Sequence, residues 1–117
     1  MKEKFNRDEA KKYLLAEDAK KKAFLEKERQ RLFETSLAVL RKEFQGSGVE
    51  VFLVGSILHS GRFTPNSDVD IVVKNFTGDR FILWTRLEEA IGRNVEVIRF
   101  ELCPFQEFVS EEGYKVV

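Results

Sequence analysis

Two short stretches decide the fold of this chain: residues 51–56, Val-Phe-Leu-Val-Gly-Ser, and residues 68–73, Asp-Val-Asp-Ile-Val-Val. Both are rich in β-branched and apolar residues, which predicts two buried strands. The first strand ends at Gly55 and Ser56. Glycine lets the backbone approach a phosphate closely, the serine hydroxyl adds a donor, and a short helix opening at Ser56 would offer free N–H groups. We therefore expect an anion-binding turn after the first strand.

The second stretch carries two carboxylates. Asp68 and Asp70 lie two residues apart on a strand, so their side chains project from the same face, while Val69, Ile71 and Val73 point into the core. Two like charges about 4 Å apart repel by roughly 4 kcal/mol at an effective dielectric constant of 20. A divalent cation that prefers oxygen ligands, above all Mg²⁺, would explain such a pair.

A third acid, Glu96, lies between Val95 and Val97 on an otherwise apolar run. If this run pairs with the strand that carries Asp68 and Asp70, the three carboxylates converge on one metal site. Two metal ions held there would activate an attacking hydroxyl and stabilise a departing pyrophosphate.

The rest of the chain predicts a small mixed sheet with flanking helices. Strands are expected at Val49–Val54, Asp68–Val73 and Val95–Phe100, helices at Asp79–Ile91 and Pro104–Glu112, and an edge strand at Tyr114–Val117. This mixture of helices and strands is typical of the α/β (α+β) class.

A long helical segment precedes this core. No Gly or Pro occurs from Lys2 to Gln45, Asn6 and Glu9 have the spacing of a capping box, and Gly46 is a helix stop. One helix of about 39 residues and two helices broken near Asp18–Lys22 both fit. We divide the chain into an N-terminal helical extension, residues 1–45, and a core, residues 46–117.

The two halves of that segment differ in apolar content. Apolar residues at helical spacing in the second half are expected to pack on the core: Leu32, Phe33, Leu37, Leu40 and Phe44. The first half has a sparser stripe at residues 13–15 and 23–25. It either overhangs the core and binds another chain, a homo-oligomer included, or forms a solvated face that closes back on its own domain.

Composition excludes several classes of function. Twenty basic and twenty acidic residues cancel, so a basic track for a nucleic acid backbone is not expected. The single cysteine, Cys103, allows no intrachain disulfide and no cysteine metal cage. The charged start and the lack of an apolar run of about 20 residues predict a cytoplasmic protein without a membrane span.

The order Gly55-Ser56, eleven further residues, Asp68-Val69-Asp70 and then apolar residues resembles the DNA polymerase β nucleotidyltransferase superfamily. The small size resembles the minimal nucleotidyltransferases that are paired with HEPN-type toxins. The similarity runs from about Val49 to the C-terminus and includes an ending, Phe108 to Tyr114, like the last helix of that family.

The resemblance implies Mg²⁺-dependent transfer of a nucleoside monophosphate, usually AMP from ATP, to an acceptor hydroxyl. By position, Gly55 and Ser56 would hold the triphosphate, helped by Ser67 and Arg62. Asp68 and Asp70 would bind both Mg²⁺ ions, and Glu96 would bind the catalytic ion and help to activate the acceptor.

One segment departs from the family pattern. Residues 57–62, Ile-Leu-His-Ser-Gly-Arg, replace the more usual Tyr-Ala-Arg-Gly, with one extra residue before Gly61. Arg62 would then take over the role of the familiar arginine. Ser67 lies in a Pro-Asn-Ser turn, where its hydroxyl is expected to order the turn or the adjacent carboxylate.

These observations favour an enzyme whose acceptor hydroxyl is supplied by a second protein, such as a HEPN-type toxin, so that the chain acts as the antitoxin. The chain leaves little room for a separate acceptor-binding domain, which supports an acceptor on another protein. The alternative is a module of the same fold that neutralises its partner by contact, with an inactive acidic cluster. A transferase acting on RNA is the third reading.

Overall fold

The structure, a computed structural model, describes residues 6–117, and its first element is one unbroken helix, α1, Arg7–Phe44. The Asn6 side chain caps it by accepting hydrogen bonds from the N–H groups of Asp8 (3.0 Å) and Glu9 (3.2 Å). The chain leaves the helix through Gln45, and Gly46 follows with a φ of 71°. The predicted cap and stop are confirmed, and of the two arrangements the continuous helix is the one that forms.

Four strands form one sheet in the order β3-β2-β1-β4. Their bounds are β1 Glu50–Val54, β2 Val69–Lys74, β3 Val95–Arg99 and β4 Tyr114–Lys115. β1 pairs antiparallel with β2 and β4, whereas β2 and β3 are parallel. A parallel pair needs a crossover connection, which α2, Arg80–Ile91, supplies. This helix is capped by Asp79 and ends at Gly92 in the left-handed conformation.

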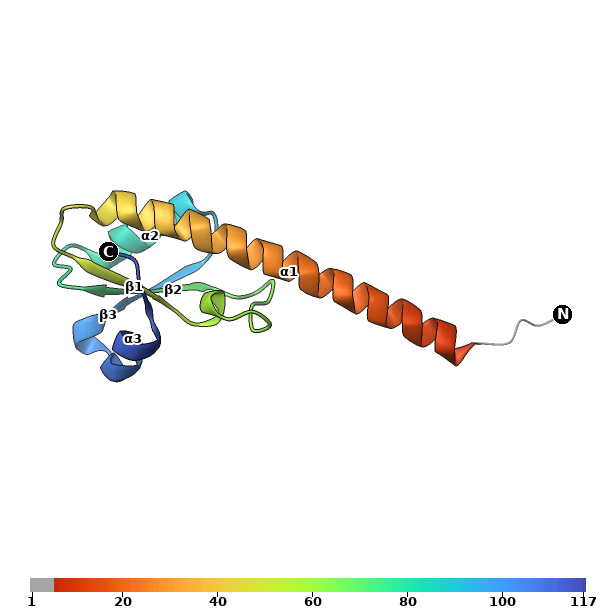
Figure 1. Ribbon diagram of the computed structural model, residues 1–117. Coiled ribbons are helices and arrows are strands. Elements are labelled where there is room, and N and C mark those ends of the chain that lie inside the picture. Colours follow the sequence, from red (N-terminus) through yellow and green to blue (C-terminus); the bar gives the residue numbers. More distant parts are fainter. Residues whose placement is uncertain (1–5) are drawn as a thin grey trace.

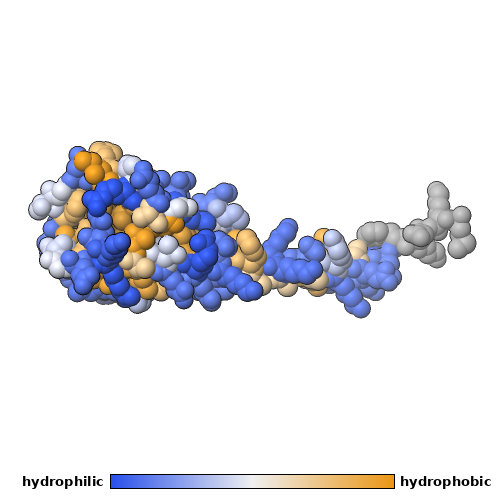
Figure 2. Space-filling view, turned by 90° about the horizontal axis from the view of Figure 1, so that it is seen from above, coloured by the Kyte–Doolittle hydropathy of each residue, from blue (hydrophilic) through white to orange (hydrophobic). Residues whose placement is uncertain are grey.

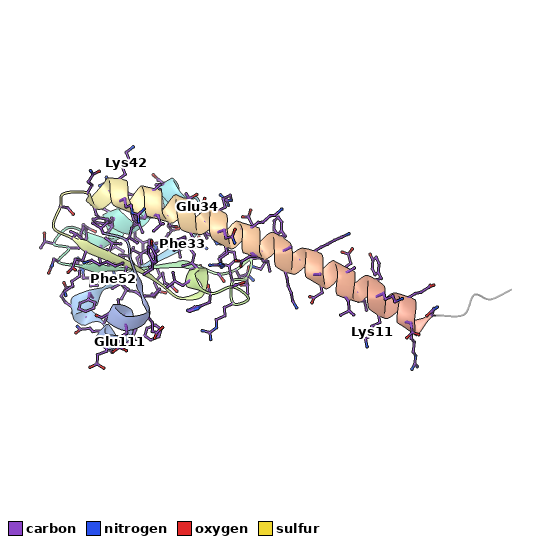
Figure 3. All side chains as sticks on the ribbon, in the orientation of Figure 1. Lys11, Phe33, Glu34, Lys42, Phe52 and Glu111 are labelled. Atoms are coloured by element: carbon purple, nitrogen blue, oxygen red, sulfur yellow. The ribbon has the colours of Figure 1, made fainter. Side chains whose placement is uncertain are left out.

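Helices cover both faces of the sheet (Figure 1). The C-terminal half of α1 and α2 pack on one face, where Leu53, Ile71 and Val97 are buried in the main core. The short helix α3, Gln106–Glu112, lies on the other face, over a smaller cluster that contains Phe52 and Val72. Figure 3 shows Phe33 and Phe52 on opposite sides of β1. The α/β (α+β) prediction, with a small mixed sheet and flanking helices, is confirmed.

Each predicted strand and helix of the core shifts by one or two residues at one or both ends. β2 begins at Val69, so Asp68 lies just before the strand. α3 begins at Gln106 because Pro104 and Phe105 form a turn ahead of it. β4 has only two residues in the ladder with β1, although Val116 beyond it still donates a hydrogen bond to the carbonyl oxygen of Val51 (2.7 Å).

The N-terminal half of α1 projects past the domain (Figure 1), so that the longest dimension of the molecule is 73 Å. Leu25 is the first apolar residue of α1 that packs against the main core. We call residues 7–24 the arm. No helix within residues 6–117 combines the length and the apolar character that crossing a membrane requires.

Candidate active site

The sheet register brings two of the three predicted acids together. Asp70 of β2 is the direct partner of Glu96 on the parallel strand β3 and of Val54 on the antiparallel strand β1. Asp68 precedes β2 on the same pleat as Asp70. The three carboxylates therefore lie at the end of the sheet where β1 ends and where β2 and β3 begin.

This acidic end belongs to the α3 face of the sheet. Side chains on one strand alternate between faces, so Asp70 shares its face with Val72, and Glu96 shares its face with Ile98. Val72 and Ile98 belong to the small cluster under α3. Beyond that cluster Asp70 is half-buried, and Asp68 and Glu96 are exposed.

The electrostatics of Asp70 follow from this position. Burial, then the charge of Glu96, then the charge of Asp68 raise the pKa of Asp70 from its ordinary 3.8 to about 6. Within residues 6–117, no side chain of Lys or Arg forms an ion pair with any of the three acids. Negative charge is thus concentrated here without a compensating cation from the described part of the chain.

The donor set fits a divalent cation in charge and chemistry, because carboxylate oxygens are the ligands that Mg²⁺ prefers. Among the described residues, no group of three or more His, Cys, Asp or Glu is already arranged as a metal cage. Assignment of Asp68, Asp70 and Glu96 as ligands therefore stays a prediction, now supported by register and by charge.

Gly55 directly adjoins Asp70. Its φ of 84° and ψ of −157° suit glycine, and a Cβ on this residue would lie 2.4 Å from Oδ2 of Asp70. Both backbone conformation and space therefore demand glycine at the end of β1. Ser56 follows and opens a single 3-10 turn, η1, Ser56–Leu58, so the short helix expected there is three residues long.

An arginine of α1 holds this turn. Arg29 donates from Nη1 to the carbonyl oxygen of Ile57 (2.9 Å), 28 residues further along the chain, and pairs with Glu26 on its own helix. The hydrogen bond from Arg29 is the main reason that the pKa of Glu26 falls from its ordinary 4.5 to about 2. The atypical loop 57–62 is thus anchored to the long helix by a partly buried charge pair.

The sequence alone did not reveal this contact. Arg29 and Glu26 have the i, i+3 spacing of many solvated ion pairs on helices, which Arg31 and Glu28 repeat two residues later. Only the carbonyl of Ile57 distinguishes the two pairs, and that contact depends on the tertiary fold.

A second arginine orders the turn before Asp68. Arg93 donates to the carbonyl oxygens of Ser67 (2.8 Å), Thr64 (3.0 Å) and Pro65 (3.0 Å), and its guanidinium lies 4.7 Å from the ring centre of Phe63. This residue follows the helix stop at Gly92, so its sequence position suggested only a loop.

The nucleotide-binding roles predicted for Ser67 and Arg62 remain predictions. The hydroxyl of Ser67 accepts a hydrogen bond from the N–H of Thr64 (2.9 Å), so it orders the turn. Beside it lies a hollow of about 340 Å³, lined by Pro65, Asn66, Ser67, Asp68, Arg93 and Asn94. Arg62 is exposed, and its side chain forms no hydrogen bond or ion pair within the described range.

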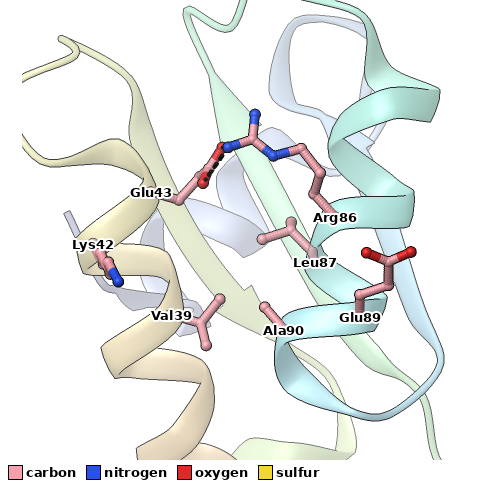
Figure 4. Close-up of a pocket in the computed structure, with 7 residues that line it drawn as sticks. All are labelled: Val39, Lys42, Glu43, Arg86, Leu87, Glu89 and Ala90. Carbon is pink, nitrogen blue, oxygen red and sulfur yellow. Dashed lines mark hydrogen bonds and ion pairs between the residues drawn. The ribbon is translucent and has the colours of Figure 1, made fainter.

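A larger hollow of about 630 Å³ lies elsewhere, between α1 and α2. Figure 4 shows its walls, with Leu87 and Ala90 facing Val39 and an ion pair of 2.9 Å between Arg86 and Glu43 spanning the two helices. Because both helices cover the opposite face of the sheet, this hollow is separate from the carboxylates.

The acidic end of the sheet lies within a part of the chain that matches a known protein family. A family model described as nucleotidyltransferase domain matches residues 34–110, about two thirds of the chain. The chain belongs to the nucleotidyltransferase domain family. No curated protein and no solved structure matches it.

Nucleotidyltransferase domains transfer a nucleoside monophosphate from a nucleoside triphosphate and use a divalent metal ion. The matched range contains Gly55, Asp70 and Glu96, and it starts at Glu34 within α1. The arm lies outside the match.

Proposed function

We propose that this nucleotidyltransferase domain transfers AMP from ATP to a hydroxyl group on a partner protein, with Mg²⁺ as the metal. The observation that carries the proposal is the register of β1, β2 and β3, which sets Asp70 against Glu96 and against the bare backbone of Gly55. A small protein toxin of the HEPN type is the acceptor that the sequence resemblance suggests, which would make this chain an antitoxin.

The reaction is a displacement at the α-phosphorus of ATP. An oxygen of the acceptor hydroxyl forms a bond to the α-phosphorus of ATP, the bond from that phosphorus to the bridging oxygen breaks, and pyrophosphate leaves. Bound Mg²⁺ would neutralise the phosphate charge, and Asp68, Asp70 and Glu96 would hold it. Glu96, which is exposed, would accept the proton of the attacking hydroxyl.

The backbone supplies the phosphate contact. Since Gly55 has no Cβ and Ser56 is half-buried beside it, the triphosphate approaches the end of β1 with the Ser56 hydroxyl as a donor. Arg29 acts through the carbonyl of Ile57 as a positioning residue for this turn.

A protein acceptor fits the charge of the molecule better than a nucleic acid does. The net charge is zero, and the carboxylates lie at an exposed end of the sheet. With no net positive charge the chain lacks the broad attraction that a nucleic acid backbone needs, whereas a hydroxyl on a protein side chain needs none.

Labelled ATP and Mg²⁺, incubated with the purified chain and a candidate partner, test the proposal. We expect labelled partner with the wild type, and at least a 100-fold loss of label transfer in D68N, D70N and E96Q. The matched control is E89Q, an exposed carboxylate on α2 away from the site. Equal transfer by D70N and wild type would overturn the catalytic assignment. If inhibition of the toxin is lost in variants of the arm and kept in the carboxylate variants, the alternative is favoured, namely a module that neutralises its partner by contact.

A further inference from the structure

The arm of α1 carries large apolar side chains that its own domain does not cover. Tyr13 and Leu14 are each 65% exposed, and Phe24 is 63% exposed. Figure 3 shows the side chains of the arm extending freely around the helix, and Figure 2 shows hydrophobic patches along it that are interrupted by hydrophilic surface. These patches lie outside the match to the nucleotidyltransferase domain family.

One face of residues 10–28 of α1, most of which belong to the arm, has the spacing of a helix that pairs with another helix. Positions 10, 14, 17, 21, 24 and 28 follow one another at alternating steps of four and three, and they are occupied by Ala, Leu, Glu, Lys, Phe and Glu. Such alternation keeps a helix seam facing a partner helix. Tyr13 and Leu25 flank this seam.

Four of the six seam positions mirror each other about Ala19, whereas the outer pair, Ala10 and Glu28, does not. Leu14 and Phe24 lie five residues on either side of it, and Tyr13 and Leu25 lie six residues on either side, so apolar positions mirror each other. Glu17 and Lys21 lie two residues on either side, so opposite charges mirror each other. A second copy running antiparallel would therefore meet apolar residues with apolar residues, and Glu17 with Lys21 twice.

A parallel second copy would not be matched in this way. In register, it would set Glu17 against Glu17 and Lys21 against Lys21, and like charges repel at such positions. Lys21 has no ion pair within residues 6–117, whereas its neighbours Lys20 and Lys22 pair with Glu17 (3.8 Å) and Asp18 (3.1 Å) on the same helix.

The structure also leaves space for the partner helix. A hollow of about 450 Å³ lies where the arm meets the domain, lined by Lys20, Lys21, Phe24, Leu25 and Pro65. In the antiparallel arrangement, Tyr13 of the partner subunit comes level with Leu25, on the flank of the seam where Phe24 lies. An aromatic side chain there would bury the exposed ring of Phe24.

We propose that the arm is the dimer interface of this protein, formed by two α1 helices that cross antiparallel about Ala19. The seam from position 10 to position 28 spans about 27 Å at 1.5 Å per residue. The two nucleotidyltransferase domains then lie at opposite ends of the helix pair, with each carboxylate site outside the seam.

Sedimentation of the full chain measures dimer formation and tests the two proposed contacts between Glu17 and Lys21. We expect a wild-type dimer that E17K or K21E alone weakens at least ten-fold, because each creates two like-charge contacts. The double variant E17K/K21E should restore the dimer. A mixture of the two single variants should form a one-to-one heterodimer, which repulsion within one helix cannot explain. Circular dichroism checks that α1 stays helical in each case.

Alanine substitutions of two neighbouring leucines test the apolar contacts. L14A should weaken the dimer at least ten-fold, whereas L15A should not, because Leu15 is 59% exposed but points about 100° further around the helix, away from the seam. A chain that stays monomeric at 100 µM, or equal effects of L14A and L15A, would overturn the proposal.

Disulfide trapping tests the register. In a C103A background, E17C and K21C chains should cross-link when mixed and oxidised, and neither should cross-link efficiently alone. Cross-linking of E17C to itself would instead show a parallel pair, and no cross-linking in a dimeric sample would place the interface elsewhere. Either result would contradict the proposal.

Discussion

The acidic end of the sheet and the arm of α1 are both rich in charged residues, but the first clusters like charges and the second pairs opposite ones. Acids at the sheet end lie beside one another, and burial together with the charges of Glu96 and Asp68 raises the pKa of Asp70 to about 6. On the arm, acids and bases alternate and form pairs one turn apart, such as Lys22 with Asp18 (3.1 Å). Paired charges stabilise a helix modestly, whereas clustered like charges cost stability and indicate a ligand.

The comparison extends to packing within α1 itself. Leu40, in the half that covers the sheet, is fully buried, whereas Leu14 on the arm is 65% exposed. One helix therefore serves both as a wall of the core and as a free surface.

Shortening a buried side chain in the C-terminal half of α1 should have the largest effect on stability. L40A should lower the free energy of unfolding by about 2–5 kcal/mol, because it removes a fully buried side chain and leaves a cavity. L14A, measured by chemical denaturation at a concentration where the chain is monomeric, should change it by less than about 0.5 kcal/mol. A large effect of L14A on the monomer would show that the arm folds back on the domain.

Substitution of Gly55 comes next. G55A should lower activity by about 100-fold, since the new Cβ displaces the Asp70 carboxylate. It should also destabilise the fold by about 1–3 kcal/mol. G61A is the matched control, because Gly61 has a similar φ of 87° but nothing within 4 Å of its Cβ position. If both variants retain equal activity, contact with Asp70 is not required for catalysis.

Neutralising Asp70 should stabilise the metal-free protein. D70N removes a charge that burial and two neighbouring acids disfavour, so at pH 7 its melting temperature should exceed that of the wild type. The gain is on the order of 1–2 kcal/mol after allowance for solvent screening. Mg²⁺ should raise the melting temperature of the wild type and not that of D70N.

The same variant has a defined pH dependence. Native Asp70 takes up its proton near pH 6, while the unfolded chain does so near 3.8. The destabilisation by Asp70 is therefore complete above pH 6 and shrinks as the pH falls toward 3.8. Thermal melts of both proteins should converge across that window, and a constant difference would contradict the assignment.

Removing Arg29 tests the link between the two regions. R29A should lower activity by about ten-fold with helix content unchanged, because the turn after Gly55 loses its anchor. R31A is the matched control, as Arg31 makes the same kind of pair with Glu28 and no contact with the loop. Equal activity of R29A and R31A would show that the anchor is dispensable.

Acid titration gives R29A a second readout. Because Arg29 holds the pKa of Glu26 at about 2, below its ordinary 4.5, their contact stabilises the fold fully above pH 4.5 and is lost as the pH falls toward 2. The wild type should therefore lose more stability than R29A across this range, as measured by denaturation at each pH.

The smallest effect is expected at the start of the arm. N6A removes the side chain that accepts hydrogen bonds from the N–H groups of Asp8 and Glu9. This loss costs about 1 kcal/mol of local helix stability. Hydrogen exchange should speed up in the first turns of α1 and not near Leu40. Faster exchange throughout the helix would show that arm and core unfold together.

Sequence alone determined the elements and the identity of the acids. Strand periodicity placed β1, β2 and β3, the capping box at Asn6 placed the start of α1, and spacing singled out Gly55, Asp68 and Asp70. These features are local, because propensity, alternation and capping depend on residues only a few positions apart.

Tertiary structure alone decided how those pieces meet. It paired Asp70 with Glu96, anchored the loop at Ile57 through Arg29, and ordered the turn at Ser67 through Arg93. It also kept α1 as one helix, whose second half is held by the core while the arm is left uncovered. Such contacts join residues more than 25 positions apart, so no local pattern specifies them, and only packing of the whole domain does.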